Sequence, residues 1–317
     1  MRNWTIAIAC ALATATLVGA EDVLPERLLA APAFKKLLPR GAVAGSPFTT
    51  QSPVVTHVQA LRAPAAQGSA VWIAAIVVHP APPARPRQAT GGASRPAAQK
   101  PELRDVEVLV FRQQGERVAR QLERRRRAYG AHALSLASLP GLEVNVAIGV
   151  QWAESTATHV GPVEVHCLGG ARPVLAFSGQ AEGFYFDAED GAPTMVLYPA
   201  DATSQVCLPT VYRWHGQRLV PAPAGGSPVA DRLLREYDEV LRSYAAGRTS
   251  GAAPLMVVDV ALSRARLLEQ SGRRPEAVKA YRTVIALAAA PGADALLAAR
   301  ASEASSRGAR LEAAPGR

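Results

Sequence analysis

The chain contains the octapeptide Phe111-Arg112-Gln113-Gln114-Gly115-Glu116-Arg117-Val118, and a second copy reads Tyr212-Arg213-Trp214-His215-Gly216-Gln217-Arg218-Leu219. The copies share an aromatic first residue, both arginines, the glycine and an aliphatic last residue. A glycine between two apolar runs is typical of a tight β-hairpin, because glycine adopts the positive φ that closes such a turn. We therefore predict antiparallel hairpins at Gly115 and Gly216.

A looser third copy runs from His166 to Val174 and has Gly170 at its turn. The three glycines recur at intervals of roughly 50 residues, which suits a four-stranded sheet module. A second correspondence relates residues 133–150 to 183–198, each with two apolar runs around a turn. We expect residues 52–223 to form a β-repeat domain, built either like propeller blades or as stacked antiparallel sheets.

The hairpin motif resembles that of exported bacterial proteins with FG-GAP or VCBS-like β repeats. In those proteins a hairpin of the form aromatic-Arg-Trp-Asp-Gly-x-Arg accompanies a loop of the form Asp-x-Asp-x-Asp-Gly. The hairpin matches well at 212–218, although His215 replaces the usual acid. The resemblance covers residues 105–221 and implies a repeat module that builds a surface for binding.

The acidic loop of that class matches this chain less well. Its alternating carboxylates supply oxygen ligands to Ca²⁺, and its glycine permits a sharp turn. Here the loop reads Asp187-Ala188-Glu189-Asp190-Gly191, so Ala188 and Phe186 occupy two of the three ligand positions. Asp187, Glu189 and Asp190 are weak calcium candidates after a one-residue slip, and an ordinary exposed turn is the alternative.

The pattern changes to a helical one after the Pro/Gly/Ala-rich linker at 220–228. Apolar residues recur every three or four positions, which predicts helices over 229–244, 255–270 and 275–289. Around Gly272 to Leu287 the pattern resembles a tetratricopeptide repeat, and a generic helical hairpin fits equally well. We therefore expect an α+β protein with a helical, tetratricopeptide-like domain at 224–299 and a flexible tail at 300–317.

Residues 1–20 have the features of a secretory signal peptide. Arg2 precedes an apolar run over 4–18, and Val18-Gly19-Ala20 offers small residues to signal peptidase. An uncleaved anchor is the alternative, but the run is shorter than the ~20 apolar residues that span a membrane. We predict export to the periplasm or the extracellular space, with no later membrane span.

Two further segments read as irregular. Residues 21–51 contain leucine pairs broken by proline and glycine, and we expect an N-terminal arm there. Residues 80–101 are mainly Pro, Ala, Arg, Gly and Gln without periodicity, which predicts a disordered insertion because such a composition buries little apolar surface.

Removal of the signal leaves two cysteines, Cys167 and Cys207. An oxidising compartment favours a disulfide between them, and two separately buried thiols are the alternative. The formal net charge is +9, and the densest basic cluster is Arg124–Arg127. This cluster lacks the interleaved aromatics on which bases stack, so we expect a solvated basic face and no nucleic-acid partner.

The chain carries none of the common short motifs of hydrolases, zinc proteases or nucleotide-binding proteins. The best local constellation is Glu164 and His166, which share one strand face, beside His159. They could form a metal or acid–base pair, or be ordinary polar strand positions. A rival hypothesis is a carboxylate pair within 182–190, lined by Trp152 or Trp214, for glycoside hydrolysis.

We therefore expect a non-enzymatic exported protein that acts as a binding or scaffold component of the bacterial envelope. Its partner would be a protein or another envelope component, and no cofactor is expected. The alternatives are a carboxylate-dependent envelope hydrolase, which would use an acid such as Glu182, and a calcium-dependent adhesion module.

Overall fold

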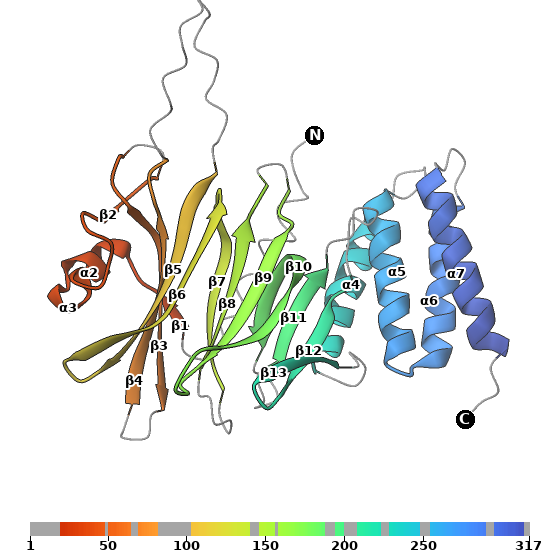
Figure 1. The fold of residues 1–317 in the computed structure, drawn as a ribbon. Helices are drawn as coiled ribbons and strands as arrows, with labels where there is room; N and C mark the ends of the chain where they lie inside the picture. The colour runs from red at the N-terminus through yellow and green to blue at the C-terminus, as the bar shows by residue number, and fades with distance from the viewer. Residues whose placement is uncertain are drawn as a thin grey trace, which may run out of the picture. The chain divides into compact units, whose positions relative to one another are not determined.

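The computed structural model describes residues 20–47, 50–64, 69–81, 103–139, 146–155, 158–187, 194–199, 208–222, 228–247, 254–289 and 295–313. Within these ranges the chain forms two sheets, two short N-terminal helices and four C-terminal helices (Figure 1). The expected α+β class is confirmed. The chain divides into one unit of residues 1–195 with 213–220 and another of 196–212 with 221–317.

The first sheet is built from long Val- and Ile-rich strands that pair with their neighbours along the chain. Its order is β1-β3-β4-β5-β6, and the short β2 pairs with β3 in parallel. Its strands are β1 (Ala20–Asp22), β2 (Val43–Ala44), β3 (Val54–Pro64), β4 (Ser69–Val78), β5 (Arg104–Gln114) and β6 (Arg117–Ala128).

The second sheet continues the same up-and-down path in the order β13-β12-β11-β10-β9-β8-β7. Consecutive strands pair throughout it, so among the described residues the β region takes the stacked-sheet form rather than that of propeller blades. Its strands are β7 (Gly130–Ser138), β8 (Val146–Ala153), β9 (Gly161–Leu168), β10 (Val174–Asp187), β11 (Thr194–Pro199), β12 (Thr210–His215) and β13 (Arg218–Ala222).

A hydrophobic core joins strands β3–β6 of the first sheet to β7–β9 of the second. It contains Trp72, Ile76 and Val108 from one sheet and Ile148 and Trp152 from the other. Every residue of β8 and of β9 is buried, so these strands are covered on both faces. Full burial of a side chain such as Ile148 stabilises the fold by about 1.5–3 kcal/mol.

The first sheet is also covered on its other face, by α2 (Pro25–Ala30) and α3 (Pro32–Lys35) (Figure 1). Leu28, Phe34 and Leu38 are buried there, and the ring of Phe34 meets that of Phe111 edge-on with centroids 5.6 Å apart. The described part of the N-terminal arm expected over 21–51 therefore packs on this sheet, where Leu28, Phe34 and Leu38 complete a second core.

Two of the three motif glycines occupy equivalent hairpin turns. Gly115 has φ 58° between β5 and β6, and Gly216 has φ 61° between β12 and β13. Gly170 differs, because the longer loop between β9 and β10 turns at Gly169, with φ 110°. The third copy is therefore not equivalent to the other two, and the three-copy repeat does not hold.

The second unit contains the helices α4 (Pro228–Ala246), α5 (Leu255–Gln270), α6 (Arg274–Ala288) and α7 (Ala295–Ala313). Gly272, with φ 70°, ends α5 in a Schellman motif, since the amide of Arg273 donates to the Leu268 carbonyl. The flexible tail expected over 300–317 is instead helical to Ala313. Ala304 and Gly308 are buried there, and their small size lets α7 pack closely on α6.

None of the helices in the described part of the chain is both long and apolar enough to cross a membrane. Residues 1–19 of the predicted signal peptide and nearly all of the predicted insertion, from 82 onward, lie outside the described residues.

Candidate functional site

Glu164 and His166 lie where the sequence predicts, on one face of β9, but they are buried rather than exposed. The His166 Nε2 atom is 3.4 Å from Glu164 Oε2. Two arginines of β6 bind the same carboxylate, with Arg124 Nη2 3.1 Å from Oε2 and Arg126 Nη1 3.1 Å from Oε1. Glu164 is therefore held by three basic side chains from two sheets.

This environment keeps Glu164 ionised. The hydrogen bond from His166 and the hydrogen bond and positive charge of Arg124 lower the pKa of the Glu164 carboxyl to about 2, although burial opposes the shift. A general acid near neutral pH needs a raised pKa, as hydrolase acids have. Glu164 is instead a fixed negative charge that joins β9 to β6.

A similar cluster surrounds Glu107 on β5, whose side chain is 3% exposed. Its Oε2 atom is 2.9 Å from His79 Nε2, and Arg125 Nη2 lies 3.4 Å from Oε1. Successive residues of a strand point to opposite faces of the sheet. Arg125 therefore binds Glu107 on one face, whereas Arg124 and Arg126 bind Glu164 on the other. The basic run is thus not simply a solvated face, because its arginines neutralise two buried carboxylates.

His159 does not join the Glu164 cluster. Its ring instead meets that of His132 on β7, with centroids 5.5 Å apart and an interplanar angle of 62°. Partial desolvation by the surrounding protein atoms and the neighbouring His159 lower the pKa of the His132 imidazole. The sequence offers no signal for this pair, because the two residues are brought together by the pairing of β7 with β8 and of β8 with β9.

The calcium candidates are only partly within the described residues. Asp187 is the last residue of β10 and is buried, and its carbonyl accepts a hydrogen bond of 3.5 Å from Thr194 Oγ1. Glu189 and Asp190 lie outside the described residues, as does Cys207. In the described part of the chain, no group of three or more His, Cys, Asp or Glu side chains is placed to hold a metal ion.

The aromatic residues named for the hydrolase hypothesis do not share one surface. Trp152 is 1% exposed in the core between the sheets, so it cannot line an open cleft. Trp214 is half-buried on β12, and Glu182 is exposed on β10. The lining expected from Trp152 is therefore absent.

Cys167 is buried on β9. Its Sγ atom lies 3.6 Å from the carbonyl of Gln217, and burial raises the pKa of the thiol to about 11. Such a thiol is a poor nucleophile because the thiolate is the reactive form. The bridge to Cys207 stays a prediction.

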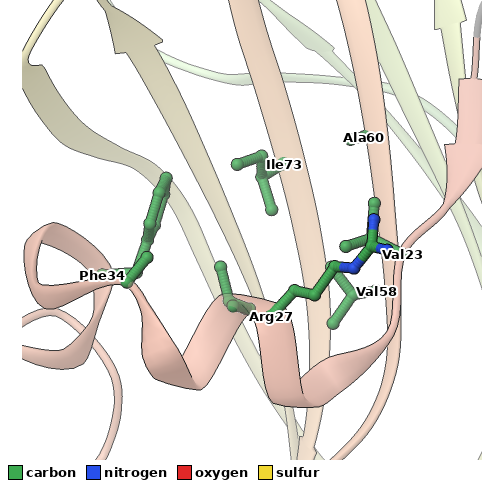
Figure 2. A pocket seen from close by; sticks show the side chains of 8 residues that line it. Val23, Arg27, Phe34, Val58, Ala60 and Ile73 are labelled. Atoms are coloured by element: carbon green, nitrogen blue, oxygen red, sulfur yellow. The ribbon is translucent and has the colours of Figure 1, made fainter.

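The described residues also form an open apolar pocket of about 120 Å³ between α2, α3 and the first sheet. In Figure 2 the Arg27 side chain extends from α2 towards Val23, while Phe34 stands at the other end and Ile73 lies on the sheet behind. Leu24, which precedes α2, is 63% exposed. The leucine pairs of 21–51 were the only sequence signal for this pocket. Its lining residues are Val23, Arg27, Leu28, Ala31, Phe34, Val58, Ala60 and Ile73.

Comparisons with protein-family models, with curated proteins and with solved structures found no match. The buried glutamates are neutralised within the fold, whereas the pocket offers apolar walls and a cation to an external group.

Proposed function

We propose that this chain is a non-enzymatic binding or scaffold component exported to the bacterial envelope, and that the pocket beside α2 is a place where it holds its partner. The observation that carries the proposal is the combination of an apolar hollow with an exposed leucine and an exposed arginine at Leu24 and Arg27. Binding sites are commonly apolar hollows with a few polar groups, and a hollow of about 120 Å³ suits an apolar side chain of a partner better than a whole small molecule, whose sites are usually about 300–1,000 Å³.

The state of the carboxylates also supports binding rather than catalysis. Glu164 and Glu107 each bind arginine and histidine, and this pairing lowers the pKa of the Glu164 carboxyl and so favours its charged form. A glycosidase needs one carboxyl that holds a proton for the leaving group and a second that is free to react. The two glutamates fit a structural role better than either of these.

The helical unit supports a scaffold role, and its tetratricopeptide-like character is part of the proposal. Helices α5 and α6 follow one another through a turn at 271–273, as in a helical repeat. Arg307 of α7 binds Glu269 of α5 at 3.0 Å, and the same carboxylate accepts a hydrogen bond of 2.5 Å from Tyr281 of α6. Three helices are thereby tied at one point.

The relation to FG-GAP or VCBS-like repeats belongs to the same proposal. It is supported by the equivalent turns at Gly115 and Gly216, which carry the two matching motifs. It would make the β region a surface for an envelope protein or polymer.

The test is a photo-crosslinking amino acid placed at Leu24 of the chain expressed in a Gram-negative host. Position Leu175, which is 48% exposed on β10, is the matched control. We expect one dominant crosslinked species at the first position and not at the second. Mass spectrometry identifies it.

A second variant, Ala60→Leu, fills the pocket from β3 and leaves Leu24 in place. The expected result is loss of the crosslinked species while far-UV circular dichroism stays unchanged. The same species captured at both positions, or capture that persists in the filled variant, would contradict the proposal.

A further inference from the structure

Two histidines that are distant from the pocket meet on the surface of the β region. His132 belongs to β7 and His159 to the segment that precedes β9, and both are exposed. Their ring centroids are 5.5 Å apart. The Glu164 cluster and the pocket use neither residue.

The spacing of the rings suits a shared metal ion. Zinc binds imidazole nitrogen at about 2.0–2.1 Å, and tetrahedral geometry then places two imidazole centroids roughly 5 Å apart. Neutral imidazole also binds copper and nickel, whereas calcium and magnesium prefer oxygen ligands. The observed separation is therefore close to that of two histidines on one transition-metal ion.

Local backbone structure orients both side chains. The pairing of β7 with β8 shifts register between Ala131 and Ala133, so His132 sits at a β-bulge. Bulges redirect a side chain relative to the regular alternation of a strand, and they are common next to functional sites. His132 therefore occupies the irregular position of the β7–β8 pairing.

A buried amide anchors the other histidine. The Nε2 atom of Gln151, a residue 2% exposed, donates to the His159 carbonyl at 2.7 Å and to the Ala181 carbonyl at 3.0 Å. A buried polar side chain that uses its donors on two backbone segments holds both of them in place. The backbone at His159 is therefore held by a hydrogen bond from a buried side chain.

We propose that His132 and His159 form a binding site for a divalent transition-metal ion of the zinc, copper and nickel class, with water at the remaining positions. This site is separate from the proposed partner pocket. Its open positions leave the ion able to accept a further ligand from outside the chain.

Isothermal titration of the purified chain with Zn²⁺ in chelator-treated buffer tests the site. We expect one zinc ion per chain, and loss of either ligand in His132→Asn or His159→Asn should weaken binding by about tenfold or more. His57→Asn and His215→Asn are matched controls that should leave the affinity unchanged. Circular dichroism checks that each variant is folded.

A substitution that restores a ligand separates metal binding from a structural role. His159→Cys replaces imidazole by a thiolate, which also binds zinc, so this variant should recover the affinity that His159→Asn loses. Absence of binding at millimolar zinc would overturn the proposal. Binding that survives both asparagine variants, or that depends equally on the controls, would overturn it as well.

Discussion

Glu164 shows how a single buried charge can connect two sheets. Its carboxylate accepts hydrogen bonds from Arg124 and Arg126, which lie on a different strand and a different sheet. Hydrogen bonds to charged groups contribute more to stability than neutral ones, about 1.5–3 kcal/mol each. The side chains of the two arginines are 46% and 34% exposed, which reduces this contribution through solvent screening.

Replacement of this carboxylate tests its structural role. We expect Glu164→Gln to lower the free energy of unfolding by about 2 kcal/mol, because both arginines lose a charged acceptor. Urea denaturation followed by tryptophan fluorescence measures the change. Glu116→Gln, at an exposed hairpin turn, is the control, and equal effects of the two substitutions would argue against the role.

The low pKa of Glu164 also predicts how the free energy of unfolding depends on pH. Its folded-state pKa is about 2, below the ~4.3 of an unfolded glutamate, so the folded chain binds fewer protons between these values. The stabilisation by Glu164 should therefore be complete above about pH 5 and decline as the pH falls towards 2. Urea curves of the natural chain and Glu164→Gln, recorded across this range, should converge at low pH. A constant difference would contradict the assignment.

At the scale of single elements, the motif glycines differ in the sign of φ at their turns. Gly115 has a positive φ with no atom near its missing side chain, whereas Gly170 has no positive φ. Gly115→Ala should therefore cost about 1–2 kcal/mol from backbone strain alone. Gly170→Ala should cost much less, and the comparison of urea midpoints checks this. Equal costs would mean that the two turns are alike.

Helix α7 is the element that the sequence pattern indicated least clearly, although it packs against the helices before it. Its Arg300 binds Asp259 of α5 at 2.8 Å, and the side chains are 12% and 0% exposed. A chain that ends at residue 299 removes this ion pair together with most of α7, and loss of one partner from a buried ion pair typically costs 3–5 kcal/mol. We expect a lower melting temperature and faster proteolysis of α4–α6. A chain that ends at Ala313 keeps the whole of α7 and is the control.

At the scale of the whole molecule, export is the property on which the proposed function depends. Residues 1–30 fused to alkaline phosphatase should give periplasmic enzyme activity, because the enzyme needs an oxidising compartment for its disulfides. Leu12→Arg interrupts the apolar run and should abolish that activity. Periplasmic activity that is unchanged by this substitution would contradict the prediction of export.

Elements with a strong local pattern were predicted well. The helix expected over 255–270 is α5 with the same bounds, and the helix expected over 275–289 corresponds to α6 (Arg274–Ala288). Apolar periodicity and the turn residue Gly272 are local properties, so they can be read along the chain. Residues 300–313 were misjudged because alanine, arginine and serine give a weak apolar stripe, and their helix is supported by contacts with α5 and α6.

The residue pairs that form the candidate sites could not be predicted from a local pattern in the same way. The strand pattern placed Glu164 and His166 together, but their arginine partners are 40 and 38 residues away along the chain. The pairs His132 with His159 and Val23 with Ile73 likewise depend on which strands pair and which segment covers a sheet.

Sequence alone therefore determined the class of the fold, the helices α4, α5 and α6 and the two equivalent hairpins, because each rests on a local pattern of nearby residues. Only the tertiary structure decided that the arginines of β6 neutralise two buried glutamates, that the N-terminal segment completes a core, and where a pocket and a histidine pair form. These features arise from long-range packing, and buried charges must find their partners across space.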